Sequence, residues 1–150
     1  MRSSDFTHVD GDKVKMVDVG GKDEVGRMAR ASGSIRLTKR TMELIKAGNV
    51  KKGNVLATAR IAAIQAAKHT WESIPLCHQI PITGIDVDFE VGEDTIKAVV
   101  VVRCVGKTGV EMEALCGASM ALLTIWDMVK AVEKDETGNY PETRISDIIV

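Results

Sequence analysis

Two alternating segments joined by a short turn place the strongest constraint on how this chain can fold. Residues 85–91 carry an apolar side chain at every second position, and residues 96–102 repeat the pattern after a turn at Gly92. A period of two puts alternate side chains on opposite faces of a strand, so the spacing predicts an antiparallel hairpin. Within the second segment, Val99–Val102 is apolar at every position. We therefore expect an interior strand that is covered on both faces.

The other segments predict an α+β fold. Thr38 and Gly48 are typical of the start and end of a short helix, and Gly53-Asn54 is typical of the start of a longer one. From residue 30, the order is strand, helix, helix, strand, strand, helix, strand, which is the ferredoxin-like βαββαβ arrangement with a two-part first crossover helix. The remaining expected elements are an extra N-terminal strand over 14–19, a strand over 30–37, a long helix reaching about 134 and a last strand over 145–150.

The core must be built from small and aliphatic side chains, because only 3% of the residues are aromatic. Ala59, Ala63 and Ala67 recur at helical spacing in the second helix and form a small-residue face. Such a face lets another backbone approach closely, so we expect it to be buried against the sheet or against another subunit.

Size, charge and cysteine usage narrow the class of protein. The 150 residues suit one domain over 1–150, with 1–12 expected to fray. A formal net charge of −1 gives no overall attraction to nucleic acid or to an anionic membrane. We see no signal peptide and no apolar run long enough to span a bilayer. The three cysteines form no CxxC pair, which suits reduced thiols and a cytoplasmic location.

The segment VVRCVGKT, residues 101–108, imitates a phosphate-binding P-loop. A P-loop requires glycine at its first position so that the backbone can wrap the phosphates, and here that position is Val101. We therefore reject a Walker-type NTPase. Backbone amides at the following helix start, with Lys107 nearby, could still hold a phosphate, and an ordinary turn with a solvated lysine explains the residues equally well.

Cys77 and His78 lie in a loop that Pro75 and Pro81 make rigid. A zinc site is disfavoured, because adjacent residues point apart and the other cysteines lack ligand spacing. A structural role for His78 and a role in holding substrate both remain open.

Charged residues occur near both ends of the long helix. Glu111 and Glu113 near its start interact favourably with the helix dipole, or they belong to a functional site. Asp127 and Lys130 are three residues apart and can pair on one helix face. Glu113 and Asp127 are separated by roughly 20 Å of helix, so a site that uses both must lie between subunits. The lysines at 51–52 precede the second helix, where a positive charge interacts unfavourably with the helix dipole. Their position therefore indicates phosphate binding, with solvated side chains as the alternative.

Four separated blocks resemble the cyclic pyranopterin monophosphate synthase family, the molybdenum cofactor biosynthesis protein C family. They are KKGNVLATARIAAIQAAKHTW, SIPLCHQIP, GKTGVEMEAL and ALLTIWDMVKAVEKD, in that order between residues 51 and 135, and KMVDVGGKDEVGRMARASG at 15–33 resembles the family too. The resemblance implies a homohexamer, a trimer of dimers with sites between subunits. It also implies conversion of 3′,8-cyclo-7,8-dihydro-GTP, the product of a radical SAM GTP cyclase, to cyclic pyranopterin monophosphate with release of pyrophosphate.

The resemblance implies roles for particular residues. Asp127, Lys130 and Lys52 match the family's catalytic positions. The substrate-binding matches are Leu76, Cys77, His78, Met112 and Glu113, with Glu111 and Arg27 as weaker ones. No redox or organic cofactor is implied, although Mg²⁺ could accompany the triphosphate.

Two departures from the family pattern bear on these expectations. Gln79 stands where many members have proline, and a Lys/Gly-rich tail common in the family does not follow the last strand. We expect Lys52 and Lys130 to transfer protons, to depress each other's pKa and to be oriented by Asp127. The alternatives are a zinc-dependent GTP ring-opening hydrolase and a binding module for RNA or a metabolite. Few aromatic residues near the hairpin disfavour RNA.

Overall fold

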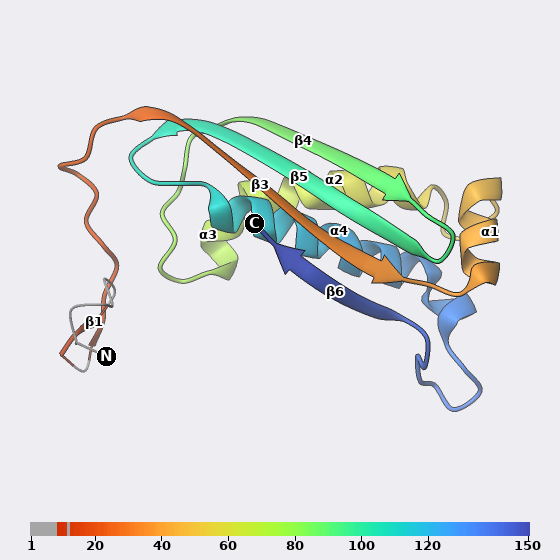
Figure 1. The fold of residues 1–150 in the computed structure, drawn as a ribbon. Coiled ribbons are helices and arrows are strands. Elements are labelled where there is room, and N and C mark those ends of the chain that lie inside the picture. The colour runs from red at the N-terminus through yellow and green to blue at the C-terminus, as the bar shows by residue number, and fades with distance from the viewer. Residues whose placement is uncertain (1–8, 12) are drawn as a thin grey trace.

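The predicted hairpin forms the middle and one edge of the sheet. β4 (Ile82–Val91) and β5 (Thr95–Gly106) pair antiparallel in a computed structural model that describes residues 9–11 and 13–150. β3 (Val25–Arg36) pairs with the other side of β5 along its whole length, and β6 (Arg144–Ile149) pairs with the second half of β3. The sheet is therefore antiparallel throughout, in the order β4-β5-β3-β6 (Figure 1).

The helices lie on one face and at one end of this sheet (Figure 1). The long helices α2 and α4 lie side by side against the face, while α1 lies at the end where β4 turns into β5. Their bounds are α1 (Lys39–Ala47), α2 (Val55–Lys68), α3 (Thr70–Ser73) and α4 (Glu111–Glu133). The two-part crossover predicted between the first core strand and the hairpin is therefore present as α1 and α2.

The predicted helix boundaries follow from their capping residues. The side chain of Thr38 accepts a hydrogen bond from Thr41 N at the start of α1, and Gly48 ends that helix with a left-handed φ of 72°. Asn54 caps α2 by accepting from Ala57 N at 3.0 Å. These side chains satisfy backbone groups that have no partner inside the helix.

Small residues let α2 and α4 approach each other and the sheet closely. Ala59, Ala63 and Ala67 are fully buried, as predicted. At Gly117 of α4, a side chain would meet Val100 Cγ1 at 3.0 Å and Ala63 O at 3.3 Å. This contact needs a residue without a Cβ, and it sets how closely α4 packs against α2 and the sheet.

By length and composition alone, α4 could cross a membrane. One face of the helix is buried against the sheet and α2, with Ala118, Leu122 and Ile125 each at 0% exposure, whereas Met120 and Leu123 are 42% and 52% exposed. This is the arrangement of a core helix.

The structure corrects two of the expected features. Of the expected strand 14–19, only Val14 lies in a strand, the two-residue β2 (Lys13–Val14), which pairs with β1 (Val9–Asp10) rather than with the main sheet. β5 is interior as predicted, but the helices of the described residues cover only one face of the sheet. On the other face, Val99 is nevertheless 6% exposed, whereas Val105 is 51% exposed. The expected fraying of residues 1–12 falls mainly outside the described residues.

Candidate functional site

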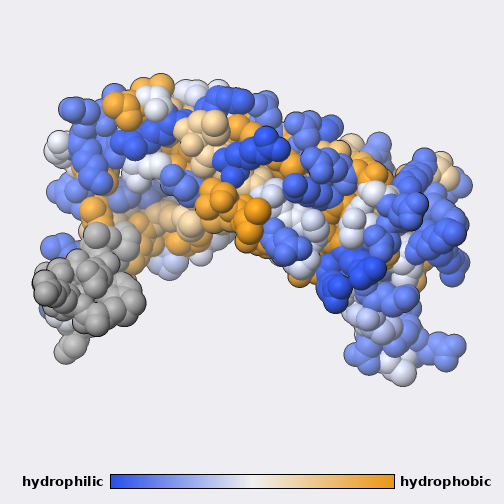
Figure 2. Space-filling view, in the orientation of Figure 1, coloured by the Kyte–Doolittle hydropathy of each residue, from blue (hydrophilic) through white to orange (hydrophobic). Residues whose placement is uncertain are grey.

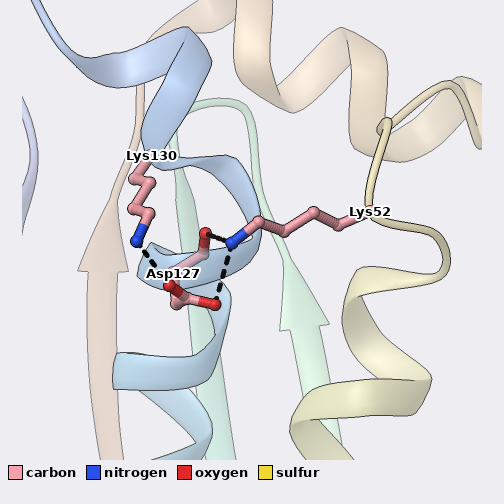
Figure 3. Close-up of polar contacts among 3 residues, drawn as sticks. All are labelled: Lys52, Asp127 and Lys130. Carbon is pink, nitrogen blue, oxygen red and sulfur yellow. Dashed lines mark hydrogen bonds and ion pairs between the residues drawn. The ribbon is translucent and has the colours of Figure 1, made fainter.

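Three charged side chains meet at the C-terminal end of α4 (Figure 3). Asp127 lies between two lysines. Lys130 Nζ is 2.9 Å from Asp127 Oδ1, one helical turn away, and Lys52 Nζ is 3.0 Å from Asp127 Oδ2. Lys52 also donates to the main-chain oxygen of Asp127 at 2.9 Å. We call these three residues the Lys–Asp–Lys cluster.

Lys52 reaches the cluster from the tight loop between α1 and α2. Gly53 N donates to Val50 O at 3.0 Å, and Gly53 has a left-handed φ of 110°. A residue with a side chain would be strained there. The turn therefore fixes where Lys52 leaves the backbone, with its side chain extended towards α4 (Figure 3).

The carboxylate in the middle controls the electrostatics of the cluster. The hydrogen bonds from Lys130 and then Lys52 hold the pKa of Asp127 below its usual value, and the bond to Asp127 raises the pKa of Lys130. The expectation that the two lysines lower each other's pKa is therefore wrong for Lys130, because an opposite charge in contact outweighs a like charge farther away. The predicted pairing of Asp127 with Lys130 is confirmed.

An open pocket of about 360 Å³ adjoins the cluster and uses residues that the sequence did not indicate. Besides Asp127 and Lys130, it is lined by Trp126 on α4 and by Tyr140 from the loop before β6. The two rings contact edge to face, with centroids 5.2 Å apart. Trp126 adjoins Asp127 in the sequence and could have been suspected, whereas Tyr140 stands in a polar loop that carries no such signal.

A second pocket, of about 290 Å³, lies at the other end of α4. It brings together six of the seven residues proposed for substrate binding, from the proline-flanked loop and the first turn of α4. We call it the Cys–His pocket. Its predicted lining residues are Leu76, Cys77, His78, Glu111, Met112 and Glu113.

The third wall of the Cys–His pocket is the segment before β3, which was not expected there. Val17, Val19 and Lys22 line the pocket. His78 Nε2 lies 2.7 Å from Val17 O, and Lys107 Nζ donates to Gly20 O at 3.1 Å. Because a carbonyl oxygen only accepts, His78 Nε2 is the donor in this hydrogen bond, which leaves Nδ1 for another partner.

The Cys–His pocket favours neutral groups. Burial raises the pKa of Glu113, with the nearby Glu111 charge adding to the effect, although the backbone amide of Glu113 opposes it. Burial is also the main cause of the raised pKa of the Cys77 thiol, followed by the charge of Glu113. Among the described residues, no three His, Cys, Asp or Glu side chains gather in a way that could hold a metal ion.

Arg27 is the one residue proposed for substrate binding that does not line the Cys–His pocket. It lies on β3 and its Nε donates to Gly106 O at 3.0 Å, at the start of the GKTG segment. Arg27 therefore supports the loop that carries Lys107 rather than facing the Cys–His pocket. Lys107 itself is occupied with the backbone of the N-terminal segment.

The two clusters lie at opposite ends of one straight helix. Asp127 follows Glu113 by 14 residues, which corresponds to about 21 Å along the helix axis. The described residues of one chain therefore place the Lys–Asp–Lys cluster and the Cys–His pocket too far apart to surround one small molecule together.

Comparisons with known proteins agree over nearly the whole chain. The MoaC family model matches residues 16–150. A protein of Methanosarcina acetivorans is 65% identical over 97% of this chain and 92% of its own length, and one of Thermococcus kodakarensis is 66% identical over 97% and 94%. Both are named probable cyclic pyranopterin monophosphate synthase. A protein of Methanothermobacter thermautotrophicus, 61% identical over 100% and 94%, is named a probable accessory protein of that synthase.

Proposed function

The chain belongs to the MoaC family, and from this premise we propose that it is a cyclic pyranopterin monophosphate synthase of molybdenum cofactor biosynthesis. Its substrate is 3′,8-cyclo-7,8-dihydro-GTP, and its products are cyclic pyranopterin monophosphate and pyrophosphate. The observation that carries the proposal is the gathering of the family-matched residues into two chemically different clusters. One cluster suits a hydrogen-bonding ring, and the other suits phosphate and proton transfer.

The Cys–His pocket takes the ring part of the substrate. Its wall offers the carboxylate of Glu113, the free Nδ1 of His78 and the backbone of residues 76–78. A carboxylate accepts hydrogen bonds from the N–H groups of a guanine-like ring, and a rigid loop holds such a ring in one orientation. The pocket volume of about 290 Å³ fits a bicyclic ring better than the whole nucleotide.

The Lys–Asp–Lys cluster takes the phosphate part. In the phosphate step, a sugar hydroxyl attacks the α-phosphorus, the bond from that phosphorus to the bridging oxygen breaks, and pyrophosphate leaves with the electron pair. The hydroxyl proton must be removed, and negative charge grows on the leaving group. Lys52 and Lys130 lie where they can neutralise that charge and move protons.

Asp127 favours the protonated form of Lys130. By raising the pKa of Lys130, it keeps that side chain protonated at neutral pH, which suits a proton donor or a fixed positive charge. We therefore assign the donor role to Lys130. Lys52 is joined to the same carboxylate from a loop rather than from the helix.

A second copy of the chain completes the site by bringing its Cys–His pocket to the Lys–Asp–Lys cluster, and the assembly is a hexamer built as a trimer of dimers. Exposed apolar side chains support this. Figure 2 shows such side chains gathered where the end of β6 lies, with Ile149 59% and Val150 65% exposed. Leu123, also on the surface, is 52% exposed, and patches of this kind mark contact surfaces.

The remaining expectations form part of the same proposal. The strand order β4-β5-β3-β6 supports a single ferredoxin-like domain over 1–150. The enzyme works in the cytoplasm without a redox or organic cofactor, receives its substrate from a radical SAM GTP cyclase and needs neither nucleic acid nor membrane. If Mg²⁺ takes part, it enters with the substrate's triphosphate, and adding and chelating the ion measures whether turnover requires it.

The test is to incubate the purified protein with 3′,8-cyclo-7,8-dihydro-GTP and follow pyranopterin and pyrophosphate by mass spectrometry. The proposal requires both products in equal amounts. Binding without conversion would contradict it and favour a metabolite sensor. Conversion that depends on stoichiometric zinc would favour a ring-opening hydrolase instead.

A further inference from the structure

Glu133, the last residue of α4, carries a buried carboxylate that neither pocket uses. It is 6% exposed, and four hydrogen-bond donors converge on it. Thr38 N donates at 3.0 Å, Thr38 Oγ at 2.6 Å and Thr143 Oγ at 2.9 Å, and Thr41 Oγ donates as well. Among the described residues, no Lys or Arg forms an ion pair with it.

A buried charge with this environment is not explained by stability alone. Replacing buried ionic groups with well-packed apolar ones is often neutral or stabilising. A carboxylate with four converging donors does, however, fix the geometry of every segment that supplies a donor. Here those segments are the start of α1, through Thr38 and Thr41, and the approach to β6, through Thr143.

Each of the three segments joined at Glu133 leads to the Lys–Asp–Lys cluster or its pocket. α4 carries Asp127 and Lys130 in the two turns before Glu133. α1 ends at Gly48, and the tight turn that follows it carries Lys52. The segment that Thr143 holds supplies Tyr140 and Ile145 to the pocket beside Asp127.

We propose that Glu133 is a positioning residue that sets where the Lys52 loop meets Asp127. It holds the start of α1 against the end of α4, and α1 in turn fixes the loop from which Lys52 reaches the carboxylate. The proposal rests on the proposed function for its effect on turnover, but the positioning itself is measured without turnover.

Hydroxyl deletions that keep side-chain shape test this role. Thr41→Val removes one donor to Glu133. Thr70→Val is the matched control, because Thr70 is equally buried and donates to Ala66 O at 3.0 Å, away from both pockets. We expect Thr41→Val to lower kcat about tenfold while KM changes less than about twofold, since small misplacements of a catalytic group are costly. Thr70→Val lowers Tm by a similar amount and keeps kcat.

Two further variants separate positioning from general stability. Glu133→Gln keeps the size and most of the hydrogen bonds, so kcat should stay within about threefold of the wild type, whereas Glu133→Leu should lower kcat at least as far as Thr41→Val. In a Lys52→Ala background, Thr41→Val should cost much less than it does alone. Losses that multiply fully, or equal kcat losses in Thr41→Val and Thr70→Val, would overturn the proposal.

Amide hydrogen exchange gives a readout that does not depend on activity. The amides of residues 49–53 should exchange faster in Thr41→Val than in the wild type, and at the wild-type rate in Thr70→Val. Unchanged exchange in Thr41→Val would overturn the positioning role even if the synthase assay succeeds. Faster exchange with no turnover in the wild type would leave the positioning role intact and contradict the proposed function instead.

Discussion

The two ends of α4 form clusters with opposite electrostatic character. At the N-terminal end, burial favours the neutral forms of Glu113 and Cys77, and three chain segments enclose the pocket. At the C-terminal end, exposed partners favour the charged forms of Asp127 and Lys130. The difference supports our proposal that one end recognises an uncharged ring and the other holds phosphate charge and moves protons.

Removing Lys52 or Lys130 should have the largest effect, and that effect should be on kcat. We expect Lys52→Ala and Lys130→Ala each to lower kcat at least about a hundredfold, because each removes a proton-transfer group. Both side chains are about half exposed, so folding and oligomeric state should be unaffected. Turnover assays together with circular dichroism and light scattering measure this. Near-normal activity in both variants would contradict the assigned roles.

Replacing Glu113, at the N-terminal end of α4, with a neutral residue should weaken substrate binding while raising stability. Glu113→Gln should raise KM about tenfold or more, because the charged acceptor for ring N–H groups is lost. The folded-state pKa of Glu113 is raised, so its ionisation costs stability as pH rises above the unfolded-state value, and this cost persists at neutral pH. Glu113→Gln should therefore raise Tm at pH 7, with the gain disappearing in acid.

The outcome that would contradict this interpretation is a lower Tm at pH 7 with an unchanged KM. Glu111→Gln provides a control, because Glu111 is exposed and lines the same pocket. Its Tm should change little in either direction.

Salt should weaken ligand binding at the C-terminal end of α4 more than at the N-terminal end, and we expect this effect to be smaller than those above. Inorganic tripolyphosphate should bind about tenfold more weakly at 1 M NaCl than at low salt, because exposed charges are screened there. Guanosine, which has no phosphate, should bind with nearly the same affinity at both salt concentrations. Titration calorimetry of both compounds measures the contrast, and equal salt sensitivity would remove the distinction between the ends.

Thiol reactivity should show the smallest effect. Because burial raises the pKa of Cys77, less of its thiolate is present at pH 7 than for a free cysteine. Iodoacetamide should therefore modify Cys77 more slowly than a cysteine in a short peptide, as followed by mass spectrometry. Faster modification would mean that the pocket stabilises charge after all.

The sequence predicted the hairpin and the long helices because apolar periodicity and capping residues are local signals. It missed the first half of β3, where Val25–Ala29 shows no alternation and pairing with β5 imposes the extended form. It predicted a strand over 14–19 that does not form beyond Lys13–Val14, since a strand also needs a partner and this segment is held instead by His78. Local pattern cannot supply that information.

The candidate site was predictable to a similar, partial extent. Spacing alone predicted the pair of Asp127 with Lys130, whereas Lys52 is 75 residues from Asp127 and was connected to it only through the family resemblance. The four-donor environment of Glu133 left no sequence signal, because threonines at 38, 41 and 143 are ordinary turn and cap residues. The sequence predicted cover on both faces of β5, and the described helices cover one face, although Val99 on the other face is 6% exposed. A run of apolar residues does not say which segment covers each face.

The central claim is that a working site takes one end of α4 from each of two chains. Co-expressing an Asp127→Asn chain with a Glu113→Gln chain tests it most directly, at a substrate concentration far below KM where we expect each variant alone to retain about a tenth of the wild-type activity or less. Random mixing places both intact halves together in about one quarter of the sites, so activity should return to about a quarter of the wild-type value. If the mixture is as inactive as either variant alone, each chain builds its own site and the claim is wrong.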